Sequence, residues 1–467
     1  MIKEVWQSMR RWFSRMFGKD VIKQAVAVEP AASDEMASAL KQWIDAFCGT
    51  PEWLSNKHPR SINLAATSSL YIARLVNAEI SVNLSGSARA DYLQKQVESY
   101  VLPQITAKTE EAIAGGYIAA KPYPYHGGIA VDFVRTDRFF PLVIEPTGEI
   151  REAVFVDQRS IGGDIYTRLE HHFFTDGVYH ISNIAYKSRS AENLGVQIAL
   201  DELTAWGELE PVVAIQGVDK PLFAVLRMPF ANTIDSSKLP VSMYANAMGT
   251  LRDIDFMYSD YCFEFNSGRR KLFVADEALS TRDDGSPILP IDSDASDYYK
   301  ILDFGNNPEK MLEDYTPEFR HQAYQDGLNQ LLRIYEAQTG VSSGTYSMDV
   351  QTGAVTATQV ISEDRNTYYT VCDIQRQSKA MLERLIEAMD TIATLYNLAP
   401  SGSYELSVSF GDSVFEDTAT EFSRRMQLVS IGMKPELLLS WYFDVPEEEA
   451  RGMLGEMSRL VDDGGMY

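Results

Sequence analysis

The chain has 467 residues, a formal net charge of −24 at pH 7 and 45% hydrophobic residues. This length predicts roughly two to four structural units, and the ordinary apolar content excludes wholesale disorder. The cysteines Cys48, Cys262 and Cys372 are odd in number and far apart, which excludes a disulfide framework and favours a reducing compartment. Because tight duplex binding usually needs a basic surplus, any role with DNA must work without gripping its phosphates.

The first 40 residues are predicted to form an arm. Residues 1–18 mix tryptophans and phenylalanines with three arginines, which indicates a basic amphipathic helix and breaks the apolar run that a signal peptide needs. Such a helix could lie on a membrane surface, but docking on a neighbouring chain is favoured. Residues 21–37 are rich in Ala, Pro, Ser and Glu, which is typical of a linker. No apolar run in the chain approaches the roughly 20 residues that span a bilayer.

Helices are predicted after the arm, and a β region follows them. The helices cover 37–53, 67–80 and 88–114, and the third is interrupted by Pro103 and ended by Gly115 and Gly116. Short alternating runs at 116–120, 129–135, 140–144, 152–156, 166–174, 177–186 and 222–228 then predict antiparallel strands. Thr175, Asp176 and Gly177 predict a hairpin turn. The histidines His171 and His172 are adjacent on a strand and point to opposite faces, so they do not share a metal.

A pair of helices around a small β insertion is predicted next. In the first helix, over 242–265, aromatic and apolar residues recur mostly at three- and four-residue spacing: Tyr244, Met248, Leu251, Tyr258, Tyr261 and Phe265. Four of these are expected to pack the helix: Met248, Leu251, Tyr258 and Tyr261. Strands are predicted at 272–274 and 298–304, and the second helix covers 318–337 after Pro317. The two helices are therefore expected to pair as a stalk that carries a small module at its tip.

The rest of the chain contains the longest predicted helix. A Gly-, Ser- and Thr-rich segment at 341–355 precedes a helix over 356–398, which at ~1.5 Å per residue would be roughly 60 Å long. A helix of that length commonly spans an assembly. A strand at 404–410 follows, and residues 417–463 are expected to be helical, with starts at Pro435 and Pro446.

The common catalytic motifs are absent from the sequence. It contains no P-loop, no paired histidines of a zinc protease and no Gly-x-Ser-x-Gly turn, so neither a P-loop motor nor those enzyme classes are supported. No cofactor is expected. The basic triplet Arg269, Arg270 and Lys271 has two compatible interpretations, contact with DNA or an acidic partner and a positive cap at a helix C-terminus.

The C-terminal half contains an ordered series of informative segments: VSMYANAMGTLRDID at 241–255, GRRKLFVADE at 268–277, YYKILDFG at 298–305, GVSSGTYSMD at 340–349, VTATQVISEDRN at 355–366 and VSFGDSVFED at 408–417. In these segments and their order, the chain resembles the portal proteins of long-tailed phages. In the family, the segment at 241–255 corresponds to the helix entering the stem, the one at 268–277 to the first clip strand and the one at 298–305 to the returning strand. The segments at 340–349 and 355–366 correspond to the stretch before the long helix and the start of that helix. The segment at 408–417 corresponds to the strand before the crown. With the β region, the resemblance covers about residues 115–465.

The resemblance implies an α+β portal fold. Its parts are an arm at 1–40, a helical then β-rich wing at 41–235, stem helices at 236–268 and 316–340, a clip at 269–315, a tunnel loop at 341–355, a long wing helix at 356–398, a wing strand at 399–416 and a crown at 417–467. It also implies a closed ring of about twelve subunits. The ring would form a DNA channel at one capsid vertex of a virion, and the chain would not be an enzyme.

The implied partners are a second copy of the chain, double-stranded DNA, terminase, head-completion or adaptor proteins, and capsid or scaffolding protein, but no membrane. The loop residues expected to face DNA are Ser343, Thr345, Tyr346, Asp349, Gln351 and Thr352, since their weak, exchangeable hydrogen bonds let a duplex slide. The docking residues expected in the clip and stem are Arg269, Arg270 and Lys271. Two alternatives remain open: a simple surface turn at 341–355, and another multimeric virion component, such as a capsid or adaptor protein, without a DNA channel. A hydrolytic enzyme assembled from distant residues is a third hypothesis.

Overall fold

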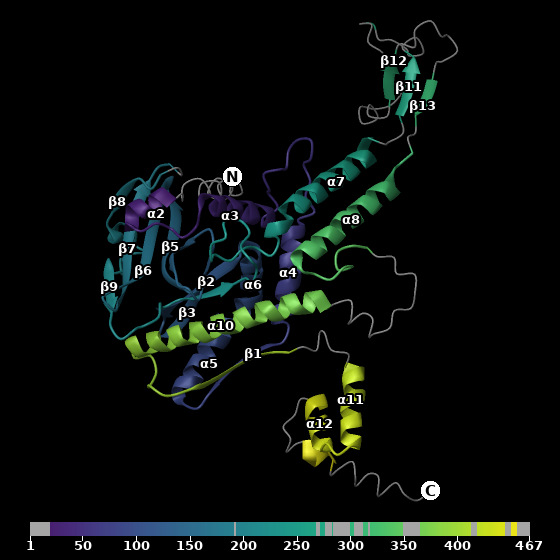
Figure 1. Ribbon diagram of the computed structural model, residues 1–467. Coiled ribbons are helices and arrows are strands. Elements are labelled where there is room, and N and C mark those ends of the chain that lie inside the picture. Colours follow the sequence, from purple (N-terminus) through teal and green to yellow (C-terminus); the bar gives the residue numbers. More distant parts are fainter. Residues whose placement is uncertain are drawn as a thin grey trace, which may run out of the picture.

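The computed structural model of the chain describes residues 19–190, 193–267, 271–275, 283, 299–302, 312–315, 318–348, 365–411, 418–443 and 450–454. Figure 1 shows a body of helices and sheets from which the helices α7 (Met248–Ser267) and α8 (His321–Thr339) project, with a small sheet at their far end. The C-terminal helices α11 (Thr418–Ser430) and α12 (Pro435–Phe443) lie side by side. The chain is therefore of the mixed α+β class.

The expected N-terminal helices are present, with boundaries set by capping residues. α3 (Asp34–Phe47) and α5 (Ala88–Tyr100) begin after Ser33 and Ser87, whose hydroxyls accept hydrogen bonds from the first helical turns. α4 covers Leu64–Asn77. Pro103 lies in a short 3-10 turn, η1 (Leu102–Gln104), between α5 and α6 (Ile105–Gly115). Gly116, with φ of 86°, ends α6 as the sequence predicted.

The prediction of a loose linker over 21–37 is wrong for its first residues. α2 (Lys19–Val26) is a helix, and its Ile22 is fully buried in a cluster with Leu142, Val154 and Leu169. Ile22, Ala25 and Val26 lie on one side of α2 and face this cluster. The Ala-, Pro-, Ser- and Glu-rich composition of residues 21–37 as a whole does not indicate this short apolar face of α2.

Two antiparallel sheets form the β region. The larger has the order β4 (Phe139–Ile144), β5 (Ile150–Ile161), β6 (Asp164–Thr175), β7 (Val178–Ser188) and β8 (Val196–Ile198), with β9 (Val212–Ile215) also paired to β7. The smaller has the order β10 (Ala224–Arg227), β2 (Tyr117–Tyr125) and β3 (Gly128–Arg135). The predicted hairpin turn is confirmed, because Thr175 pairs with Val178 and both Asp176 and Gly177 have positive φ angles of 52° and 77°.

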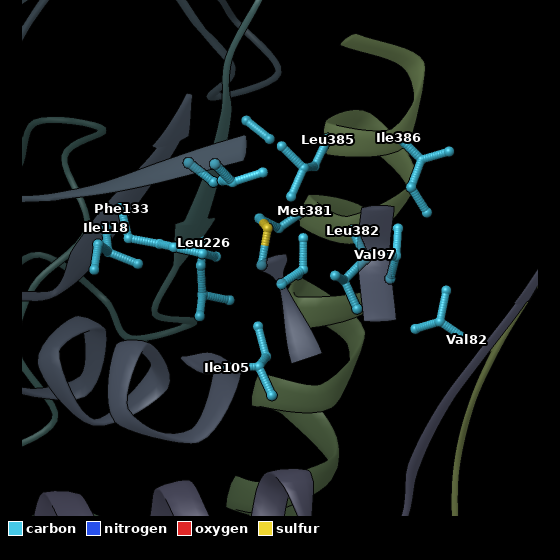
Figure 2. Packing of buried hydrophobic residues seen from close by; sticks show 14 of the residues in the cluster. Val82, Val97, Ile105, Ile118, Phe133, Leu226, Met381, Leu382, Leu385 and Ile386 are labelled. Atoms are coloured by element: carbon cyan, nitrogen blue, oxygen red, sulfur yellow. The ribbon is translucent and has the colours of Figure 1, made fainter. Parts of the chain in front are cut away.

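The long helix α10 (Arg365–Leu395) organises the main core. It packs on β10, β2, α4 and α5, and its face carries Leu382, Leu385, Ile386 and Met389, all fully buried. Figure 2 shows Leu382 and Leu385 of this face between two groups of side chains: Ile118, Phe133 and Leu226 of the smaller sheet on one side, and Val97 of α5 on the other. The described helix has 31 residues and is about 46 Å long; residues 356–364 of the predicted helix lie outside the described ranges.

Two small sheets complete the fold. β14 (Glu405–Phe410), which the sequence predicted, pairs antiparallel with β1 (Ile80–Ser85), which it did not. At the end of the projecting helices, β11 (Lys271–Ala275) lies between β12 (Tyr299–Leu302), parallel to it, and β13 (Leu312–Tyr315), antiparallel to it. β11 and β12 match the two predicted strands of the insertion, and β13 is an additional one.

Candidate functional site

The projecting helices α7 and α8 form a stalk that is joined along its length. Near the body, the Thr250 hydroxyl donates to the Gln338 side chain at 2.8 Å. Further along, Gly327 lets the helices approach, since a Cβ there would lie 3.1 Å from the Met257 sulfur. Near the tip, the Arg320 guanidinium binds both carboxylate oxygens of Glu264 at 2.9 and 2.7 Å. The two helices are therefore expected to move as one element.

An aromatic cluster supports the tip of the stalk. The ring of Tyr261 lies 5.7 Å from the rings of both Phe319 and Tyr324, and Phe265 lies 4.1 Å from Phe319. Of the residues expected to pack the first helix, Leu251 is buried, Met248 is partly buried against the same core, Tyr261 joins the aromatic cluster and Tyr258 is half-buried. α7 and α8 pack against each other along the stalk.

The foot of the stalk is held by a chain segment between α3 and α4. Asp255 is buried and accepts hydrogen bonds from the Trp53 indole at 2.9 Å and the Ile62 amide at 3.1 Å. One turn further, Ser259 accepts from the Arg60 amide and donates to its carbonyl. Burial raises the pKa of Asp255, although the bonds from Trp53, Ser61 and Ile62 oppose that shift.

A buried carboxylate on α8 gathers the polar turn that follows this helix. Glu336 has no exposed surface, and its Oε1 accepts from the amides of Tyr346 and Ser347 at 2.5 and 2.7 Å. Its Oε2 accepts from the Gly344 amide at 3.1 Å and the Ser347 hydroxyl at 2.9 Å. Four donors therefore satisfy one buried charge and fix the turn against the stalk.

The same turn is tied to α10 and to a second residue of α8. Ser342 and Thr367 each accept the other's backbone N–H through their hydroxyl oxygens, at 2.9 and 3.1 Å. The Thr370 hydroxyl donates to the Gly340 carbonyl at 2.7 Å. Asn329 pairs its side-chain amide with both backbone polar groups of Met348 at 2.7 Å. The stalk, the turn and the first turns of α10 thus form one hydrogen-bonded junction, comprising Asn329, Glu336, residues 340–348, Thr367 and Thr370.

The structure places the predicted loop residues unequally. Ser343 is exposed, and Thr345 is half-buried with its hydroxyl donating to the Ser342 carbonyl at 2.7 Å. Tyr346 is half-buried, and its ring packs 5.9 Å from the ring of Tyr71 and 6.0 Å from that of Tyr335 within the subunit. Asp349, Gln351 and Thr352 lie outside the described residues.

The predicted docking residues are only partly described. Lys271 is the first residue of β11, where its backbone pairs with Tyr315. Arg269 and Arg270 lie outside the described residues. Sequence reasoning missed Glu336 and Thr367, which hold the junction together. One signal was available: Glu336 follows Leu332 and Tyr335 on the apolar side of its helix, where a charge needs nearby donors.

The described residues contain no group of three or more His, Cys, Asp or Glu side chains placed to hold a metal ion. Among the described helices, none combines the length and the apolar character needed to cross a membrane.

Comparison with known proteins relates the chain to solved structures and to a protein family. Two solved structures share 12% sequence identity with the chain: "Virion of native gene transfer agent (GTA) particle", with TM-score 0.47 and coverage of 91% of this chain and 98% of that one, and "Neck of native GTA particle computed with C12 symmetry", with TM-score 0.39 and coverage of 89% and 99%. No curated protein matches. The family model described as "Phage portal protein, SPP1 Gp6-like" matches residues 109–460, most of the chain. The chain therefore belongs to the SPP1 Gp6-like phage portal protein family.

Proposed function

We propose that copies of this chain close into a ring at one capsid vertex and form the channel through which double-stranded DNA is packaged and ejected. Membership of the portal family supports this role, which is structural and not enzymatic. The observation that carries the proposal is the junction at 340–348, which joins the stalk rigidly to the long helix α10. A ring subunit needs such a joint, because errors in the angle between its parts accumulate around the ring and prevent closure.

The parts of the subunit follow from this placement. We propose that 41–235 form the wing, α7 and α8 the stem, the sheet β11–β13 the core of the clip, α10 the long wing helix and α11–α12 part of the crown. Among the described residues, the clip sheet has three short strands, with β12 and β13 at its edges. Neighbouring clips in a ring would cover such edges, which are otherwise prone to unspecific pairing.

The tunnel loop is proposed to begin beyond the junction. Ser343 and Thr345 remain available at the edge of the turn, while the residues bound to Glu336 are not. The carboxylate surplus, 66 acidic against 42 basic residues, favours repulsion of the duplex over adhesion. DNA therefore slides past hydroxyl and amide groups that exchange their hydrogen bonds quickly with water.

The proposed partners are terminase during packaging, head-completion proteins afterwards, and capsid or scaffolding protein around the wing. We expect terminase and head-completion proteins to dock on the clip, because it lies at the far end of the stem (Figure 1). Replacing Arg269, Arg270 and Lys271 together with Glu is expected to weaken this docking. If docking is unchanged, the three residues act only as a positive cap of α7 and do not bind these partners.

Native mass spectrometry of the purified full chain tests the ring. A dominant closed oligomer of about twelve subunits is expected. A monomer at every concentration would overturn the proposed function, and an open series of oligomers without a closed species would favour another multimeric virion component.

A further inference from the structure

Arg227 ends β10 with its guanidinium lying against the turn between β4 and β5. Gly148 makes this contact possible, because its φ of +88° suits glycine and a Cβ there would lie 2.6 Å from Arg227 Nη2. Two cavities of about 420 Å³ each adjoin Arg227, and Thr147, Arg227 and Gln377 line both of them. The side chain therefore lies where two hollows of the surface meet, between the β4–β5 turn and α10.

The guanidinium of Arg227 has unused hydrogen-bond donors. Its Nε is buried without an acceptor, and no carboxylate among the described residues forms an ion pair with it. Burial lowers its pKa, and only longer-range attraction from Glu149 opposes this. An arginine in this position costs free energy in the isolated subunit unless an acceptor arrives.

The other cations that line the cavity containing Phe223 and Met381 already have partners. Arg151 binds Glu145 at 2.9 Å and lies over the ring of Phe174. Lys220 and Arg384 both bind Glu387, at 2.9 and 2.8 Å. Arg227 thus differs from its described neighbours in the cavity in having a free planar fork of N–H groups.

A carboxylate is the acceptor that fits best. A guanidinium binds it through two parallel hydrogen bonds, and the apolar lining by Phe223 and Met381 strengthens the attraction by lowering the local dielectric. A DNA backbone fits less well, because the acidic residues Glu145, Glu149 and Asp219 also line this cavity. A single carboxylate side chain can pass these residues, whereas a row of phosphates is repelled.

We infer that Arg227 binds an Asp or Glu side chain of the neighbouring subunit in the ring. The inference rests on the proposed function, which places an identical chain beside this one. That neighbour brings 66 acidic residues, 24 more than its basic ones. The pocket is therefore an interface site that helps to hold adjacent wings in register.

The test compares the wild type with R227M, R227K and R151M, which makes the same Arg→Met change at a paired arginine of the same cavity. Ring and monomer are quantified by native mass spectrometry over a dilution series at two salt concentrations. Thermal melting of the diluted monomers checks folding. For R227M, the concentration of half-assembly is expected to rise about tenfold or more, because the neighbour's carboxylate loses its cation. R227K is expected to be intermediate, and R151M close to wild type.

The variants also separate the competing explanations. Wild-type rings are expected to weaken as salt rises, and R227M rings to depend less on salt. Equal assembly of R227M and wild type would overturn the inference while leaving the ring intact, and impaired DNA retention in such rings would assign Arg227 to phosphate instead. A lower melting temperature of monomeric R227M would place the partner within the chain and also overturn it. If the wild type forms no ring, the proposed function itself fails.

Discussion

The carboxylate of Glu336 accepts hydrogen bonds from both the backbone N–H and the hydroxyl of Ser347, at 2.7 and 2.9 Å. Two further amides complete its shell, so a charge with no exposed surface is fully satisfied. The turn that follows α8 is thus built around a residue of α8 itself. Met348, the last described residue of this turn, is held against α8 by the side chain of Asn329.

Replacing Glu336 with Gln is expected to destabilise the folded subunit by about 2 to 3 kcal/mol. The amide nitrogen of Gln is a donor, so it would face at least one backbone N–H that can no longer be satisfied. Chemical denaturation at constant protein concentration measures the change. The control is E383Q on α10, which alters an exposed carboxylate and is expected to change stability by less than about 0.5 kcal/mol. Equal effects of the two variants would contradict this role of Glu336.

The junction also determines which loop deletion is informative. Removing 350–354 leaves the donors to Glu336 in place, so rings are expected to assemble while DNA packaging or retention is impaired. Removing 344–354 takes away three residues that bind Glu336, and assembly is expected to fail as well. Ring yield and packaged DNA are measured for both. Normal packaging by the shorter deletion would remove the tunnel-loop assignment.

The two tyrosines of α7 are expected to contribute unequally to the stem. Tyr261 contacts Phe265, Phe319 and Tyr324, so Tyr261→Ala is expected to cost about 2 to 4 kcal/mol. Tyr258→Ala removes a ring of the same size that is half-buried like Tyr261 but lies outside this cluster, so a smaller loss is expected. Hydrogen exchange of α7 and α8 would locate the difference at the tip of the stem. Faster exchange at the foot instead would contradict the assignment.

Acid is expected to weaken the body through a buried network in the larger sheet. His172 contacts the Tyr179 hydroxyl at 2.5 Å and Glu170 at 2.8 Å, and Glu170 also binds Lys121 at 2.7 Å. Burial lowers the pKa of His172 more than Glu170 raises it. Burial alone would raise the pKa of Glu170, but Lys121, His172 and Arg168 hold it well below its usual range.

Both depressed pKa values have the same consequence for stability. The unfolded chain binds more protons than the folded chain, so the free energy of unfolding falls as the pH drops below about 6.5 for His172 and below about 4.3 for Glu170. His172→Gln is expected to be less stable at pH 7 and to depend less on pH between 7 and 5. His180→Gln, on the paired strand, is the control. Identical pH profiles of wild type and His172→Gln would contradict the role of this histidine.

Much of the fold follows from local patterns. The turn at Asp176 and Gly177 needs positive φ angles, and Gly116 ends α6 in the left-handed region, so the residue types alone indicate both. The helices of the stalk and α10 carry continuous apolar faces. β1 was not predicted, because its strand is defined by pairing with β14, more than 300 residues further along the chain.

The candidate site was less predictable than the fold. Ser343 and Thr345 sit in a turn that its Gly and Ser content revealed, but the direction of Tyr346 depends on the rings of Tyr71 and Tyr335. A glutamate in a helix usually faces solvent. The role of Glu336 is therefore evident only from its hydrogen bonds to the turn that packs over it. Contacts between distant segments decide these positions, and sequence spacing does not encode them.

The most direct test of the portal assignment is a cryo-electron microscopy reconstruction of the purified full chain. We expect a closed ring with α7 and α8 around an axial opening wide enough for a double helix, and with Ser343 and Thr345 near that opening. Compact single subunits at all concentrations, or a closed assembly without an axial opening, would contradict it.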